Sequence, residues 1–256
     1  MLREHLFHKR AAADPMFRWR GGEVSRIEGI SDGVFAVTLT LLVVTTSVPR
    51  TLWELWLLVR DLPVFIVSFV LLKQAWYYHY QFFRRYGLGD LGTVTLNSVF
   101  LFLVLFFAYP LKFLADFLWK LILGLPLEPL FSVPAEVAAD HWLRDGLTQR
   151  SAMMVFYGAG LIGIFGVLAL LLWRAWSKRE ELELDALERH LTRASLAHHL
   201  LQVSVAALSL ILLALTRSPG LAGMTYFLLG PLHAAIGVWG GRKASRLHHA
   251  LTTSAP

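Results

Sequence analysis

The chain has 256 residues, of which 56% are hydrophobic and only 16% are charged. A soluble domain is typically about 45–50% apolar and about 25% charged, so this composition predicts an all-α polytopic membrane protein. The net charge of +6 suits orientation in a bilayer, and we expect no nucleic-acid partner. The sequence contains no cysteine, which excludes disulfides, thiolate metal sites and cysteine nucleophiles.

The N-terminal segment 1–26 is basic and polar, and it lacks the short apolar run and cleavage site of a signal peptide. We therefore expect the first apolar run to stay in the mature protein, with segment 1–26 on the cytoplasmic side. Residues 27–246 are predicted to form one six-span membrane domain, and residues 247–256 a flexible tail.

Six apolar stretches approach the roughly 20 helical residues needed to cross a hydrocarbon core about 30 Å thick. Helices are expected because these runs are apolar on every side, whereas the strands of a membrane barrel alternate. The predicted spans are 27–48, 62–82, 94–114, 153–173, 196–216 and 221–240.

The distribution of positive charge predicts that both termini lie in the cytoplasm. This topology places 16 of the 24 Lys and Arg residues inside and 7 outside, with Lys73 within a span. Residues 115–149, which contain three prolines and several acidic residues, are predicted to form an outer loop with short interfacial helices. Residues 174–195 are predicted to form a charged cytoplasmic helix that extends a span.

The first span is unusual because it carries Glu28, Ser31 and Asp32 at its entrance. Ionisable groups near hydrocarbon cost several kcal/mol unless they are paired or hydrated, so these residues indicate a functional segment. Glu28 could also add a weak cation-attracting field, which Arg26 opposes.

Four residues of this span share one helical stripe: Val37, Thr40, Leu41 and Val44. Around a symmetry axis, this stripe would form a narrow apolar conduit with one ring of hydroxyls, and such a conduit can gate by dewetting. The alternative is ordinary helix packing, with the Thr40 hydroxyl bonded to the carbonyl of Ala36.

Residues of the first three spans resemble the transmembrane protein 175 family of potassium channels. The first-span match is Arg26, then Ile30-Ser31-Asp32, then the apolar run 33–43 that contains threonine. Ile30 departs from the family, which usually has phenylalanine there. Further matching positions are Trp76, His79 and Asn97.

The resemblance implies a potassium-permeable channel over 27–246, with its pore lined by the first span around a four-fold axis. The chain carries the Ser-Asp-Gly sequence once, so the resemblance implies a homotetramer in a prokaryotic plasma membrane. It places the apolar constriction at Val37, Leu41 and Val44, and the selectivity threonine at Thr40. Potassium would bind only transiently near Thr40, and we expect no resident metal, cofactor or catalytic residue.

The same resemblance assigns Ser31 and Asp32 to a helix-packing network with Trp76, His79 and Asn97. Arg26 belongs to the same signature. Asp32, His79 and Asn97 all lie near the cytoplasmic ends of their spans and could meet at similar depth. Lys73 is a further possible charge partner of Asp32, because an unpaired lysine within a span is costly unless it reaches the interface.

Two other classes of function are weighed against the channel. A secondary transporter would favour broken helices and an internal repeat, and neither is evident in the sequence. An intramembrane enzyme using Asp32 and His79 would need both residues to face a water-filled cavity. The adjacent pairs His198-His199 and His248-His249 lack a metal-ligand spacing with glutamate, and we expect them to be solvated or interfacial.

Overall fold

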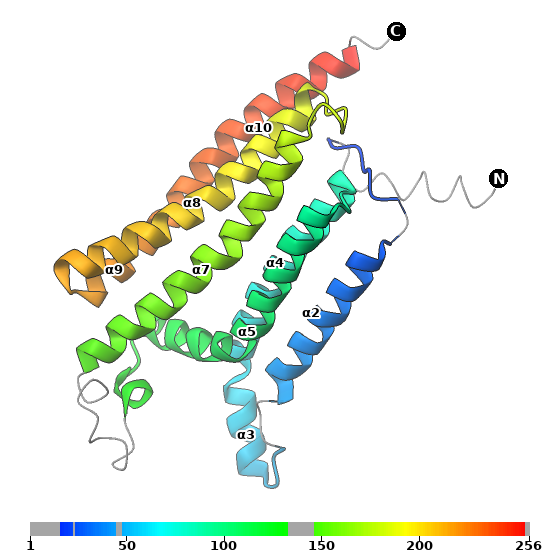
Figure 1. The fold of residues 1–256 in the computed structure, drawn as a ribbon. Helices are drawn as coiled ribbons and strands as arrows, with labels where there is room; N and C mark the ends of the chain where they lie inside the picture. Colours follow the sequence, from blue (N-terminus) through cyan, green and yellow to red (C-terminus); the bar gives the residue numbers. More distant parts are fainter. Residues whose placement is uncertain (1–15, 23, 45–47, 133–145, 254–256) are drawn as a thin grey trace.

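The structure is a computed structural model that describes residues 16–22, 24–44, 48–132 and 146–253. All regular secondary structure in these ranges is helical (Figure 1). The long helices are α2 (Arg26–Val44), α4 (Leu62–Tyr86), α5 (Leu91–Ile122), α7 (Gly146–Ser177), α8 (Ala186–Thr216) and α10 (Leu229–Thr253). Shorter elements are α3 (Leu52–Arg60), η2 (Glu128–Phe131), α9 (Pro219–Met224) and η3 (Thr225–Leu228).

Four helical segments of the described chain are long and apolar enough to cross a membrane, and they match the last four predicted spans. They are Leu91–Ile122, Gln149–Ser177, Ala186–Thr216 and Pro219–Ala250. Helices α3 and α4 together pass the same criteria but meet at a bend of 46°, which could make a fifth span. The first predicted span corresponds to α2, which is not among these segments. A total of six crossings therefore stays a prediction.

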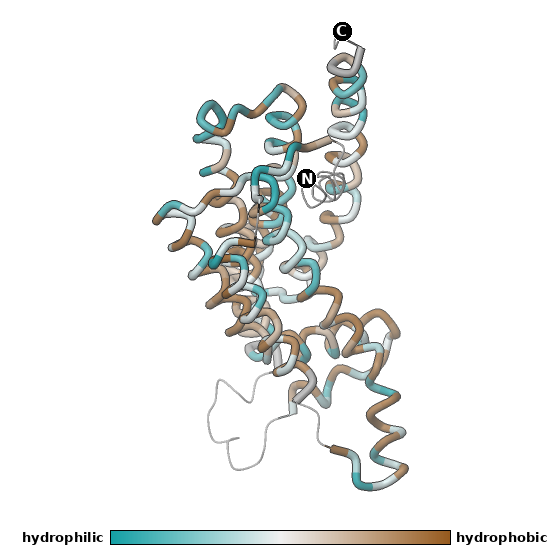
Figure 2. Tube along the Cα trace, turned by 90° about the vertical axis from the view of Figure 1, so that its right-hand side faces the viewer, coloured by the Kyte–Doolittle hydropathy of each residue, from teal (hydrophilic) through white to brown (hydrophobic). Residues whose placement is uncertain are grey.

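Two groups of helices make up the bundle (Figure 1). Helices α2, α4 and α5 pack against one another, whereas α8 lies between α7 and α10. Packing of α5 against α7 joins the two groups. Polar residues gather toward the end of the bundle that carries the C-terminus, where α4 ends and α7 turns into α8 (Figure 2). We call this the basic end, because Arg84, Arg85, Arg174 and Arg189 lie there.

An aromatic and aliphatic core lies where the two groups meet, toward the basic end. Phe100 of α5 and Leu171 of α7 are fully buried in it, beside Phe35 of α2 and Phe82 and Tyr86 of α4. Burying a large apolar side chain contributes about 1.5–3 kcal/mol relative to leaving it exposed. The core therefore fixes one face of α2 against the other helices.

Several helix boundaries differ from the sequence predictions. The charged segment 174–195 is divided between two helices, because α7 ends at Ser177 and a turn leads into α8. Glu183 adopts a left-handed φ of 48°, and Asp185 forms a capping box with Glu188 that starts α8. These local signals stop one helix and begin the next.

The remaining differences concern loops and ends. The sixth predicted span is not one continuous α-helix, since α9 and η3 precede α10. α10 itself continues to Thr253, into the predicted tail. The prediction for 115–149 missed the end of α5 at Ile122 but agrees with the short helix η2, and residues 133–145 lie outside the described part. Helix α3 was not predicted at all.

Candidate functional site

The entrance of α2 is closed by a reciprocal cap between Ser25 and Glu28. The Ser25 backbone N–H donates to Glu28 Oε2 at 2.9 Å, and the Glu28 N–H donates to Ser25 Oγ at 3.2 Å. Glu28 Oε1 also lies 3.5 Å from Nε of Arg84, and both side chains are largely buried. The charge of Glu28 is thus balanced within the protomer, which argues against the cation-attracting field that the sequence suggested.

A chain of hydrogen bonds joins α2, α5 and α4 through Ser31, Asn97 and His79. Asn97 Nδ2 donates to Ser31 Oγ at 3.1 Å, and Ser31 Oγ donates to the carbonyl of Ile27 at 2.7 Å. Asn97 Oδ1 lies 2.8 Å from His79 Nε2, which must carry the proton because the amide oxygen only accepts. Because Ser31, Asn97 and His79 are all buried, losing one partner would leave the others unsatisfied.

Aromatic rings enclose the His79 imidazole. It stacks on Phe100 with ring centroids 5.6 Å apart and an interplanar angle of 7°, and Phe83 lies at 4.7 Å. Phe35 of α2 contacts the same imidazole at 5.9 Å. The hydrogen-bond chain is therefore held in a tightly packed and mostly apolar setting, where polar contacts are strongest.

Asp32 faces away from that buried chain and accepts a separate hydrogen bond. Trp76 Nε1 donates to Asp32 Oδ1 at 3.1 Å, and the indole stacks on Tyr80 with centroids 5.4 Å apart. Asp32 is exposed on the protomer surface. Within the described residues, neither Arg26 nor Lys73 forms an ion pair with it, so the suggested Lys73 partnership is absent there.

The structure thus brings five of the six predicted signature residues together in two sets. Ser31, Asn97 and His79 form the buried set, whereas the exposed Asp32 and the half-buried Trp76 form a separate pair. Arg26 is exposed and takes no part in either set among the described contacts. That these residues serve packing rather than conduction stays a prediction.

Val37 and Thr40 of the predicted pore stripe lie on a face of α2 that no other helix covers within the described residues. Val37 is 55% exposed, Thr40 is exposed and Leu41 is half-buried. Val44 is the last residue of α2, and its side chain lies outside the described part.

The opposite face of α2 packs into the protomer through Phe35, Thr38 and Leu42, all of them buried. Thr38 and Thr40 use their hydroxyls alike, because Thr38 Oγ1 donates to the Val34 carbonyl at 2.7 Å and Thr40 Oγ1 to the Ala36 carbonyl at 2.9 Å. The two threonines therefore differ in exposure rather than in local bonding. Each hydroxyl keeps acceptor lone pairs, but only Thr40 is exposed.

A long-range contact that sequence reasoning missed fixes the segment before α2. Arg20 and Gly21 donate their backbone N–H groups to the carbonyl of Arg84 at 3.1 Å. The Arg20 guanidinium reaches the Leu182 carbonyl at 2.7 Å and the carboxylate of Glu188. Leu182 and Glu188 lie 162 and 168 residues from Arg20 in the chain, so no local pattern could have indicated them.

A second ion pair at the basic end joins Asp90, before α5, to Arg174 near the end of α7. The hydrogen bonds from Arg174 and from the Thr93 hydroxyl hold the pKa of Asp90 well below its usual range. Gly92 leaves room for this contact, because a Cβ there would lie 2.4 Å from Cζ of Arg174.

The expectation that His198 and His199 are solvated or interfacial is wrong for His199, which is packed inside the bundle and only 5% exposed. His199 packs edge-on against Tyr78 with ring centroids 4.7 Å apart, and His198 Nδ1 lies 2.7 Å from Nδ1 of His233. Adjacent histidines on a helix point in different directions, and the neighbouring helices α4 and α10 decide what each one meets.

Comparisons with known proteins bear on the same region. Residues 26–107 match the family described as endosomal/lysosomal potassium channel TMEM175. A protein from Marivirga tractuosa named as a potassium channel is 36% identical over 247 residues, which cover 94% of this chain and 98% of the relative. The chain belongs to the TMEM175 family of potassium channels. A relative from Chamaesiphon minutus, also named as a potassium channel, is 32% identical over 132 residues, covering 47% of this chain and 60% of that protein.

The TMEM175 fold is matched as well. A crystal structure of a variant of the potassium channel MtTMEM175, in complex with a Nanobody-MBP fusion protein, superposes with a TM-score of 0.73 at 36% identity. The match covers 91% of this chain and 98% of that one. The TMEM175 family match spans α2, α3, α4 and the first part of α5, and it includes the helices that hold Ser31, His79 and Asn97. The relatives are named as channels, not as enzymes.

Proposed function

We propose that this chain forms a homotetrameric cation channel that favours potassium, with the uncovered face of α2 lining the pore. The observation that carries the proposal is the exposure of Val37 and Thr40 in the middle of an apolar helix whose other face is buried. Asp32 is also exposed, at the edge of the uncovered surface beside Trp76 of α4. An acidic side chain facing lipid is costly, so that side of α2 is more stable against water or a neighbouring subunit.

The pore chemistry follows from the two kinds of side chain on this face. Four copies of Val37 and Leu41 would form an apolar constriction. Such a constriction conducts ions when water fills it and blocks them when it is dry. Four copies of Thr40 would add a ring of hydroxyl oxygens whose protons are bonded to the Ala36 carbonyls, leaving lone pairs for a passing cation. Such oxygens can replace part of the hydration shell of potassium.

Thr40→Ala and Thr38→Ala form a matched pair for the test, since both remove a hydroxyl bonded to the same helix but only Thr40 is exposed. Flux would be measured in liposomes of purified protein with potassium or sodium gradients. We expect Thr40→Ala to lower the potassium preference several-fold and Thr38→Ala to keep it. Equal preference in wild type and Thr40→Ala would remove Thr40 from the selectivity site.

The same liposomes distinguish a channel from a transporter. A flux that saturates at slow turnover and requires a co-transported proton would contradict a channel. The oligomeric state is measured separately by native mass spectrometry, where four protomers of 28.9 kDa are expected. A mass of one or two protomers would contradict the four-fold pore.

The apolar constriction is tested with Val37→Ser and Leu41→Ser, which replace apolar side chains with a smaller polar one and so ease wetting. We expect both to raise the resting flux, and Val37→Ser to raise it more, because Val37 is the more exposed of the two. Unchanged flux in both variants would place the constriction elsewhere.

A further inference from the structure

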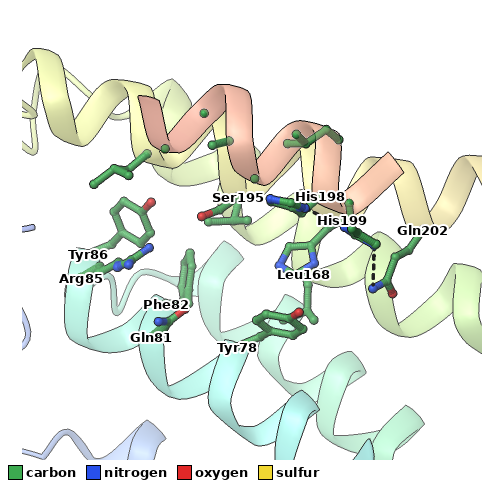
Figure 3. A pocket seen from close by; sticks show the side chains of 18 residues that line it. Tyr78, Gln81, Phe82, Arg85, Tyr86, Leu168, Ser195, His198, His199 and Gln202 are labelled. Carbon is green, nitrogen blue, oxygen red and sulfur yellow. Dashed lines mark hydrogen bonds between the residues drawn. The ribbon is translucent and has the colours of Figure 1, made fainter. Parts of the chain in front are cut away.

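A cavity of about 550 Å³ lies away from α2, between α4, α7, α8 and α10 (Figure 3). Its volume falls within the roughly 300–1,000 Å³ of small-molecule sites. α4 packs against α7 and α10 packs against α8, whereas at most slight contact joins α4 to α10 within the described residues. The cavity therefore lies between α4 and α10, and a molecule held in it would touch both helices.

One end of the cavity is polar, and we call it the histidine end. Its polar side chains come from α8 and α10, and they are His198, His199, Gln202 and His233. His198 and Gln202 are four residues apart and share one face of α8, as His233 and Gly237 do on α10. Tyr78 of α4 lies beside this end, because its ring contacts that of His199 edge-on with centroids 4.7 Å apart.

The hydrogen bonds at the histidine end determine which nitrogen atoms carry protons. Gln202 Nε2 lies 3.4 Å from His233 Nε2 and can only donate, so the His233 nitrogen accepts. A neutral His233 then carries its proton on Nδ1 and donates it to His198 Nδ1 at 2.7 Å. His198 in turn carries its own proton on Nε2. The hydrogen-bond chain therefore runs from Gln202 through His233 to His198 and ends in an N–H donor.

Two buried atoms at the histidine end have no hydrogen-bond partner among the described residues. They are Oε1 of Gln202, which can only accept, and Nδ1 of His199, whose side chain is 5% exposed. Buried polar atoms are nearly always hydrogen-bonded, either within the protein or to another molecule. The histidine end is therefore suited to a ligand that donates to Gln202 Oε1 and accepts from His198 Nε2.

The lining favours a ligand without net charge. No Asp, Glu or Lys lines the cavity within the described part of the chain, so a cation would have no counter-charge there. Arg85 lies about two helical turns along α4 from Tyr78, and its guanidinium carbon is 5.0 Å from the centroid of the Phe17 ring. A charged group at the histidine end would thus lose hydration without gaining a charged partner.

The walls next to the histidine end favour a flat molecule. Phe82 of α4 and Leu168 of α7 contribute apolar surface. α10 contributes Gly237 and Gly241, where a Cβ would meet no atom within 4 Å. A planar ring can pack against the Phe82 phenyl group and the glycine backbone, whereas an acyl chain would bring apolar carbon to the polar atoms of Gln202.

We propose that this cavity is a binding site for a neutral, planar lactam, whose N–H donates to Gln202 Oε1 and whose carbonyl accepts from His198 Nε2. Gln202 and His198 are one helical turn, about 6 Å, apart along α8, a separation that two hydrogen bonds to a lactam can bridge. The ring of the ligand lies between Phe82 and α10. It contacts α4, α8 and α10 together and so stabilises their arrangement.

Binding is tested by titrating the purified full-length protein in detergent with 2-quinolinone, a neutral fluorescent lactam. The matched probe is 1-methyl-2-quinolinone, because the methyl group replaces the N–H proton and leaves the ring and the carbonyl. We expect the methylated probe to bind about tenfold more weakly, since Gln202 Oε1 then keeps no donor. Partitioning into micelles would produce the opposite order, because the methylated probe is the more apolar one.

Two glutamine variants test the hydrogen bond. Gln202→Leu removes the acceptor and keeps a side chain of similar size. Gln81→Leu is the control, because Gln81 lines the same cavity but its Nε2 donates to the Tyr77 hydroxyl at 2.8 Å. We expect only Gln202→Leu to weaken 2-quinolinone binding, by about tenfold, and neither variant to change binding of the methylated probe. Equal affinity of wild type and Gln202→Leu for 2-quinolinone would contradict the proposed hydrogen bond.

Two substitutions on α10 locate the binding site. A Cβ at Gly237 or at Gly230 meets no atom within 4 Å, so the fold tolerates a side chain at both, but only Gly237 lines the cavity. Gly237→Phe should abolish binding of 2-quinolinone, whereas Gly230→Phe should retain it. Equal binding in the two variants would place the ligand outside this cavity.

Other outcomes also contradict the site. Absence of binding of 2-quinolinone, or equal affinity for the two probes, would overturn the lactam assignment. A phospholipid that stays bound to wild type and Gly230→Phe in native mass spectrometry, but not to Gly237→Phe, would show a lipid in the cavity instead. These measurements need no ion flux, so their failure is distinguishable from a failure of the channel proposal.

Discussion

Arg20 and Glu188 form a bidentate ion pair that connects the segment preceding α2 to the first turn of α8. Arg20 Nη2 lies 2.5 Å from Glu188 Oε2, and Nη1 lies 3.0 Å from Oε1. The two side chains are only 12% and 3% exposed. The same carboxylate accepts a hydrogen bond from the backbone N–H of Arg18 at 2.8 Å. One glutamate therefore binds both Arg18 and Arg20.

Replacing Arg20 with glutamine is expected to destabilise the protein by about 3 kcal/mol, because it leaves a buried carboxylate without its counter-charge. Thermal unfolding in detergent measures the change. Arg60→Gln is the control, since its pair with Asp61 is more than 60% exposed on both sides and such pairs contribute about 0–1 kcal/mol. Similar melting temperatures for the two variants would contradict a structural role for the Arg20 pair.

Asn97→Leu tests the buried hydrogen-bond chain. The substitution removes the partner of both His79 and Ser31, and we expect a loss of about 1–3 kcal/mol in the free energy of unfolding. Ser98→Ala, on the exposed side of the same helix, removes a hydroxyl bonded only to the Val94 carbonyl and should change stability little. Equal stability of the Asn97 variant and wild type would show that the chain is dispensable.

Asp32→Ala is expected to impair assembly more than ion selectivity, because the carboxylate bonds to Trp76 and faces the outside of the protomer. Size-exclusion profiles of the purified variants measure assembly. Asp32→Asn keeps the Oδ1 acceptor and should retain more of the assembled species. A normal elution profile with altered selectivity would instead place Asp32 on the ion path.

Gly160→Ala tests the close approach of α5 and α7. A Cβ at Gly160 would lie 2.3 Å from the Phe107 ring, so we expect a loss of about 1–3 kcal/mol from overpacking. Gly166→Ala lies on the same helix with no atom within 4 Å and should be neutral, or stabilising by up to about 1 kcal/mol. The difference is measured by thermal unfolding of both variants. A neutral Gly160→Ala would contradict a close approach at this point and mean that the Phe107 ring moves aside at little cost.

The Asp90–Arg174 pair predicts a pH dependence. Because the pKa of Asp90 is lower in the folded protein, the ionised carboxylate stabilises the fold above the ordinary value of 3.8, and this contribution decreases as the pH falls below it. The difference in melting temperature between wild type and Asp90→Asn should therefore be constant from neutral pH to about pH 5 and shrink at lower pH. Solvent screening of this partly exposed pair keeps the difference small. A difference that grows on acidification would contradict the assignment.

The sequence by itself determined the class of the protein and most of its long helices. The apolar runs predicted α4, α5, α7 and α8, because their length and hydrophobicity are local properties of the chain. The residues of the signature were also sufficient to indicate the family. The stripe of Val37, Thr40 and Leu41 followed from the helical period, which decides which residues share a face.

Only the tertiary structure decided what each face meets. Thr38 and Thr40 are close in sequence and bond alike, yet one is buried against the protomer and the other is exposed. The pairing of Arg20 with Glu188 and the cavity around His199 depend on helices far apart in the chain. The physical reason is that helix formation is set by neighbouring residues, whereas burial, ion pairing and cavity shape arise from packing between elements that no local pattern specifies.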